Sequence, residues 1–124
     1  TLEIFDEPKA QRKRIMRITT DSRPMDQPKD PATDHLFQLF SLVAEPAQIE
    51  EMDGLYRRGG FGYGDVKKAL ADAAEKYFGP ARARREELAA HPDQVRDILA
   101  DGAARARKKA SEVLARAKRA CGLL

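Results

Sequence analysis

The chain has 124 residues, of which 42% are hydrophobic and 35% are charged, and its formal net charge is +3. This length fits one ordinary domain, and the absence of Trp with only 6% aromatic residues predicts a thin core of small aliphatic side chains. No apolar run is long enough to span a bilayer, and a single cysteine excludes an internal disulfide. The composition is typical of a helical protein and favours the reducing cytoplasm.

The first twenty residues predict a short apolar segment followed by a helix. Residues 1–5 are expected to be the end of a longer preceding domain, because their apolar side chains have nothing before them to pair with. These side chains are Leu2, Ile4 and Phe5. Asp6 can cap a helix that has Pro8 in its first turn, where proline is tolerated. We expect this helix to end near Thr20.

A proline-rich stretch separates this helix from the next one. Prolines 24, 28 and 31 exclude regular structure from residues 21–31, and they reduce the entropy lost when such a loop becomes ordered. Asp30-Pro31 is expected to open the second helix. Its apolar residues have the spacing of one buried helix face. They are Leu36, Leu39, Phe40 and Val43.

Three further helices follow in the sequence. Glu45-Pro46 predicts the start of the third, which ends at the glycine-rich stretch 59–64. The fourth is expected from about Asp65 to Ala90, with Gly79-Pro80 as an end or a kink, and with Val66, Leu70, Ala73, Tyr77 and Phe78 inward. His91-Pro92-Asp93 starts the last helix, whose apolar stripe runs from Val95 to Cys121. No strand pattern competes with these predictions.

The sequence contains no complete catalytic, cofactor or metal site. In the glycine-rich stretch, Asp65 follows Gly64, whereas a phosphate-binding loop requires Lys and then Ser or Thr. His35 and His91 lie far apart and Cys121 stands alone, so neither a zinc site nor a cysteine nucleophile is expected. We therefore expect no catalytic residue, no metal ligand and no cofactor bound by this chain.

Basic and aromatic residues alternate on both sides of the glycine-rich stretch. The four candidate RNA-binding cations are Arg57, Arg58, Lys67 and Lys68. Tyr56 and Tyr63 lie among them. Cations interleaved with aromatic rings can bind phosphates and stack on unpaired bases, although Tyr63 equally fits a core position. The basic residues from Arg105 onward are better explained as an ordinary solvated helix face.

Three segments resemble parts of bacterial tryptophanyl-tRNA synthetases, in the same order. YRRGGFGYGDVKKAL (residues 56–70) resembles the turn and helix found late in that family. RIMRITTDS (residues 14–22) is similar to the helix that follows its ATP-binding KMSKS loop. VRDILADGAARAR (residues 95–107) resembles its C-terminal helix. The resemblance covers nearly the whole chain and implies the C-terminal helical region of such a class I synthetase.

The resemblance also implies a fold class and a division of the chain into three segments. The fold class is all-α, an irregular helical bundle of about five helices like the anticodon-binding domain of tryptophanyl- and tyrosyl-type synthetases. Residues 1–5 are then the end of a catalytic Rossmann domain. Residues 6–92 form the helical tRNA anticodon-binding domain. Residues 93–124 are a C-terminal helix that packs back on the catalytic domain.

The implied parent enzyme is a cytoplasmic tryptophan–tRNA ligase. It is expected to act as a homodimer and to have no membrane partner. It activates tryptophan with ATP and Mg²⁺ and loads it on tRNA(Trp). This chain lacks the HxGH and KMSKS motifs, so alone it is expected to be inactive. Its expected partners are tRNA(Trp) and the N-terminal catalytic domain. The four candidate cations are chosen by their chemistry and not by a family motif.

Two other functions remain open from the residues alone. One is a free-standing basic helical protein that binds nucleic acid without sequence preference. The other is a helical module that docks a protein partner on the face from Gly102 to Cys121. Discrimination between tRNAs with different anticodons would separate the synthetase region from both, and the resemblance favours it.

Overall fold

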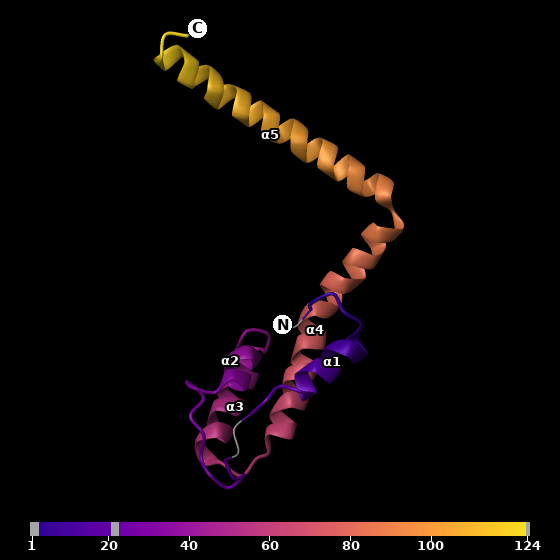
Figure 1. Cartoon of the computed structure of the whole chain (residues 1–124). Coiled ribbons are helices and arrows are strands. Elements are labelled where there is room, and N and C mark those ends of the chain that lie inside the picture. Colours follow the sequence, from indigo (N-terminus) through magenta and orange to yellow (C-terminus); the bar gives the residue numbers. More distant parts are fainter. Residues whose placement is uncertain (1–2, 21–22, 124) are drawn as a thin grey trace. The chain divides into compact units, whose positions relative to one another are not determined.

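The computed structural model describes residues 3–20 and 23–123, and within them the regular structure is all-helical (Figure 1). The helices are α1 Pro8–Met16, α2 His35–Ser41, α3 Pro46–Arg58, α4 Tyr63–Ala90 and α5 Pro92–Ala120. The predicted all-α class with about five helices is confirmed. Thr1 and Leu2 of the expected N-terminal segment, and Asp21 and Ser22 of the segment that resembles the family, lie outside the described residues. The chain divides into two compact units, residues 1–82 and 83–124.

Helix α2 begins later than the sequence predicted, because a different aspartate caps it. Asp34 Oδ1 accepts hydrogen bonds from the backbone N–H groups of Leu36 at 2.8 Å and Phe37 at 3.1 Å. Asp30 instead closes a turn, in which its carboxylate accepts the N–H of Ala32 at 3.0 Å. The expectation that Asp30-Pro31 opens the helix is therefore wrong, since Asp30 forms its bonds before the helical turns start.

The ends of α1 also differ from the prediction, whereas the start of α3 agrees with it. Glu7, and not Asp6, is the N-cap of α1, and Asp6 forms an ion pair of 3.0 Å with Arg14 further along the helix. The helix ends at Met16, before Thr20. Helix α3 begins at Pro46 as predicted, and the N–H of Glu45 donates to Gln48 Oε1 at 3.1 Å. Proline at the first helical position has no N–H group to leave unpaired, and the bond to Gln48 satisfies the N–H group of the N-cap residue.

One apolar cluster holds the unit of residues 1–82 together. Its buried members come from α1, α2, α3, the turn before α4, and α4. They are Ile15, Leu36, Phe40, Tyr56, Phe61, Val66, Leu70, Ala71, Ala73 and Ala74. Tyr77, predicted to face inward, is 59% exposed. Helix α4 continues through Gly79-Pro80, so these residues do not end it.

Polar contacts fix α1 on α4 within this unit. Arg12 Nη1 of α1 lies 2.6 Å from Asp72 Oδ1 of α4, and this hydrogen bond raises the pKa of the Arg12 guanidinium. Lys67 Nζ of α4 donates to the carbonyl of Met16 at 3.4 Å. Both contacts lie at the edge of the apolar cluster, because the charged ends of the side chains remain solvated.

The unit of residues 83–124 contains the end of α4 and the whole of α5. Helix α5 has no buried residue, and its apolar side chains, among them Leu99 and Val113, are exposed. The free thiol of Cys121 is exposed as well. Within the described residues, no helix combines the length and the apolar character that crossing a membrane requires.

Candidate nucleic-acid interface

The proline loop, residues 23–31, is bound to the turn between α3 and α4. The carbonyl of Met25 accepts the N–H groups of Gly60 at 2.8 Å and Phe61 at 3.2 Å. The N–H of Lys29 donates to the carbonyl of Tyr56, in the last turn of α3, at 2.8 Å. These bonds join two segments that lie far apart in the sequence. The loop is therefore ordered by tertiary contacts in addition to the stiffness of its prolines.

Gly59 makes this close approach possible. Its φ is +75°, in the left-handed region, and a Cβ at this position would lie 2.7 Å from the carbonyl oxygen of Asp26. Glycine alone adopts this conformation at low cost and also leaves room for the neighbouring backbone. The turn after α3 thus requires glycine for two independent reasons.

Lys29 is buried, with 3% of its surface exposed, and the sequence analysis did not identify it. Its Nζ donates to the carbonyls of Pro24 and Gln27, each at 3.2 Å. The same atom lies 4.3 Å from the ring centroid of Phe61 and 5.4 Å from that of Tyr63. Carbonyl dipoles and ring faces can both stabilise an ammonium group. The indication in the sequence that Lys29 is buried was weak, since the neighbouring prolines were the only sign of an ordered loop.

Arg57 is held by an ion pair on its own helix. Its Nε lies 2.6 Å from Asp53 Oδ2, and its Nη2 lies 3.0 Å from Asp53 Oδ1. The hydrogen bond to Arg57 lowers the pKa of the Asp53 carboxyl, and the same bond raises the pKa of the Arg57 guanidinium. Two parallel bonds fix the plane of the guanidinium and leave its remaining N–H groups available to an anion.

Arg57 lines an open depression of about 500 Å³ between the proline loop and the end of α3. Its other lining residues are Arg23, Pro28, Lys29, Asp30 and Pro31. The depression places two arginines at one site, and the sequence analysis had identified only one of them. Arg23 was not identified from the sequence, because it lies in a loop that has no hydrophobic periodicity.

The four predicted cations have different surroundings. Arg58 lines a separate groove of about 260 Å³ together with residues of α2, α3 and α4. Lys67 donates to α1, as described above, and Lys68 Nζ lies 3.2 Å from Asp65 Oδ1. Tyr56 is fully buried, and its hydroxyl donates to Asp34 Oδ1 at 3.1 Å, so this ring cannot stack on a base.

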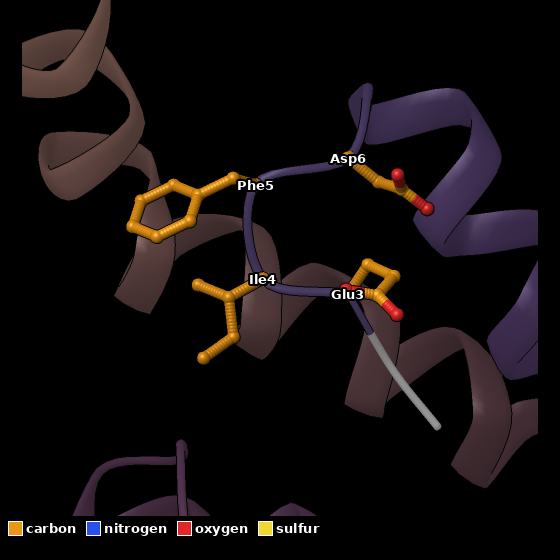
Figure 2. A pocket seen from close by; sticks show the side chains of 4 residues that line it. All are labelled: Glu3, Ile4, Phe5 and Asp6. Carbon is orange, nitrogen blue, oxygen red and sulfur yellow. The ribbon is translucent and has the colours of Figure 1, made fainter.

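The segment before α1 forms a second polar site in the same unit (Figure 2). Arg82 Nε donates to the carbonyl of Ile4 at 2.9 Å, and Arg82 Nη2 donates to Gln11 Oε1. Gln11 Nε2 in turn donates to the carbonyl of Glu3 at 3.2 Å. A pocket of about 340 Å³ lies here. Figure 2 shows the Phe5 and Asp6 side chains pointing to opposite sides of the segment. The buried Arg82 and Gln11 thus bind backbone and have no evident chemistry of their own.

No group of three or more His, Cys, Asp or Glu side chains gathers among the described residues in a way that could hold a metal ion. Carboxylates close to the depression bind partners within the protein. Asp30 accepts backbone and hydroxyl groups of its turn, and Asp53 binds Arg57. The arrangement suits the binding of a polyanion better than bond-making chemistry.

Comparisons with known proteins agree in sequence and in structure. A tryptophan–tRNA ligase of Rhodopirellula baltica is 62% identical over 123 residues, which are 99% of this chain and 38% of the relative. A tryptophan–tRNA ligase of Fusobacterium nucleatum is 35% identical over 124 residues, which are 100% of this chain and 38% of the relative. No family model matches the chain.

Among solved structures, tryptophanyl-tRNA synthetase from Campylobacter jejuni, complexed with ADP and tryptophan, superposes with a TM-score of 0.79 at 34% identity. The match covers 99% of this chain and 39% of that one. The chain thus spans 38% of the length of the curated relatives described here. In sequence and in fold, it belongs to the tryptophanyl-tRNA synthetase family and matches the C-terminal helical region of its members.

Proposed function

We propose that this chain is the tRNA-binding helical region of a tryptophan–tRNA ligase. The observation that carries the proposal is the 62% identity to such a ligase over 99% of the chain. The whole protein would activate tryptophan with ATP and transfer it to tRNA(Trp), as a class I aminoacyl-tRNA synthetase in the cytoplasm. The chain would contribute binding energy and orientation, and the rest of the protein would carry out the chemistry.

We assign separate roles to the parts of the chain. Residues 6–92 would form the anticodon-binding domain. Residues 93–124 would pack on the catalytic domain, and the exposed apolar side chains of α5 support this role because such a stripe gains free energy when it is covered. Residues 1–5 would lead from the catalytic domain, and the bonds from Arg82 and Gln11 would hold this connection in place.

ATP and Mg²⁺ would bind outside this chain. The described residues provide neither a carboxylate cluster for a divalent cation nor a glycine-rich phosphate loop after a strand. On this proposal, the described residues would take no part in the activation reaction. The homodimer expected for the whole protein would likewise form through contacts of its catalytic part.

The RNA-binding surface would include the end of α3 and the depression beside it. Arg57 and Arg58 are exposed, and Arg57 shares the depression with Arg23. Lys68 is exposed at the start of α4 and would contribute a weaker contact, because Asp65 partly neutralises it. Lys67 would contribute least, since its ammonium group already binds α1.

The test is the affinity of the chain for tRNA(Trp), measured at several salt concentrations and compared with a tRNA that differs only in its anticodon. We expect preference for tRNA(Trp). Combined Arg57→Ala and Arg58→Ala should weaken binding and reduce the salt slope by about 0.7–0.9 for each phosphate that the variant no longer neutralises. The matched control is Arg107→Ala with Lys108→Ala, which removes the same charge from exposed positions of α5.

Equal affinity for both tRNAs and for heparin would replace the proposal with a nucleic-acid-binding protein without sequence preference. Absence of binding, together with stable self-association, would favour a protein-interaction module. Equal reductions of affinity in the α3 variant and in its α5 control would place the RNA-binding surface outside the end of α3.

A further inference from the structure

The buried ammonium group of Lys29 has no role in the proposed function so far. We propose that Lys29 is a positioning residue of the RNA-binding surface. Its side chain fixes the proline loop on the turn after α3, so that Arg23 and Arg57 face the depression in one arrangement. This inference rests on the proposed function and adds to it the group that organises the site.

The surroundings of the ammonium group carry the first step of the argument. Burial of a charge is costly unless hydrogen bonds and opposite charge compensate it. Among the described residues, Lys29 forms no ion pair with a carboxylate. Its compensation comes from the carbonyls of Pro24 and Gln27 and from the ring of Phe61. The carbonyls belong to the proline loop and the ring belongs to the turn, so the full compensation is present only while the loop and the turn remain together.

The main chain of Lys29 supplies the second step. Its N–H donates to the carbonyl of Tyr56, the residue directly before Arg57. Its side chain binds the loop that follows Arg23, so the residue contacts both walls of the depression. Two independent bonds from one residue thus set the distance between the two arginines.

Burial also separates this role from a direct contact with RNA. With 3% of its surface exposed and its Nζ bonded to two carbonyls, Lys29 cannot reach a phosphate without leaving its site. Removal of its charge should therefore change affinity through the geometry of the loop. The dependence of binding on salt should remain the same, because Arg23 and Arg57 keep their charges near the same phosphates and lose only the single orientation that the loop gives them.

The experiment uses Lys29→Met in the full chain, with Lys13→Met on α1 as the matched control at an exposed lysine. We expect Lys29→Met to bind tRNA(Trp) about ten-fold more weakly, a loss of about 1.4 kcal/mol, with an unchanged salt slope. The control should change the affinity less than about two-fold. Helix content, from far-UV circular dichroism, should remain that of the parent chain.

Two further measurements test positioning against general stability. Arg57→Ala should weaken binding less in the Lys29→Met background than in the parent chain, because Arg57 then still meets its phosphate but with a less favourable orientation. Amide hydrogen exchange should accelerate at Gly60 and Phe61, whose N–H groups bind the loop through Met25, and remain slow in α4.

The outcomes separate this inference from the proposed function. Unchanged affinity in Lys29→Met would overturn the inference while the parent chain still binds tRNA. A salt slope reduced by about one would overturn it in favour of direct phosphate binding by Lys29. Unfolding of the helices would show a general stabilising role and would also overturn it. If the parent chain fails to bind any tRNA, the proposed function fails, and the assignment of Lys29 to RNA binding fails with it.

Discussion

The two units of this chain form helices for different reasons. In residues 1–82, side chains from separate helices cover one another, and Leu70 of α4 is 2% exposed. In residues 83–124, α5 is one of the longest helices of the chain, yet none of its residues is buried, and Leu99 is 67% exposed. The first unit therefore depends on long-range packing, whereas α5 depends on contacts within itself.

Local chemistry explains how α5 forms without a core. Pro92 and Asp93 lie in its first turn and Lys118 and Arg119 in its last, an arrangement that complements the helix dipole. Arg105 pairs with Asp101 one turn earlier at 2.9 Å. Each exposed pair contributes only about 0.3–0.5 kcal/mol. Covering the apolar face of α5 would therefore add to the stability of this helix.

The largest expected effect is that of a Leu→Ala substitution in the first unit, compared with the same type of substitution in α5. Leu70→Ala should lower the free energy of unfolding by about 2–5 kcal/mol, because it leaves a cavity in the cluster. Leu99→Ala should change it by less than about 0.5 kcal/mol, since it removes little buried surface. Urea denaturation followed by circular dichroism measures both. A cost for Leu99→Ala as large as that for Leu70→Ala would show that α5 is packed and that the two units do not differ in this way.

A second matched pair of substitutions concerns glycine. Gly59→Ala should destabilise the first unit by about 1–3 kcal/mol, because its φ of +75° is strained for alanine and the added Cβ meets the backbone of Asp26. Gly102→Ala, within α5 and with open space around it, should raise helix stability by up to about 1 kcal/mol. Thermal unfolding followed by circular dichroism distinguishes the two signs. A stabilising Gly59→Ala would show that the turn does not need glycine.

The smallest effect concerns an exposed ion pair and its pH dependence. The hydrogen bond to Arg57 lowers the pKa of Asp53 below its ordinary value of 3.8. The stabilising effect of the pair is thus complete above the pKa of the unfolded chain, and it is lost as pH falls through the lower pKa of the folded chain. Titration of the carboxyl group by NMR should give a value below 3.8, which Arg57→Gln should raise. An unchanged value in Arg57→Gln would show that the pair does not persist in solution.

Local sequence patterns were enough to predict the class of fold and most helix starts. Pro46 and Pro92 begin helices as predicted, because proline at a first turn is a local preference. The apolar spacing in α2 and α4 correctly indicated Leu36, Phe40, Val66 and Leu70 as core residues. Three segments in order also sufficed to indicate the family. These features depend on residues close together in the chain, so their pattern can be recognised from the sequence alone.

The organisation of the candidate site, in contrast, depends on tertiary contacts that the sequence did not reveal. Tyr56 looked available for stacking, but it is buried because Phe37 and Phe61 enclose its ring at centroid distances of 5.2 and 4.8 Å. Lys29 was not singled out from the sequence, and it lies between carbonyls of its own loop and the ring of Phe61. Its burial depends on a residue in a distant segment of the chain, and no local periodicity encodes such a partner. Likewise, the residues that make α5 helical are close together in the sequence, whereas its own sequence does not show what would cover its exposed apolar side chains.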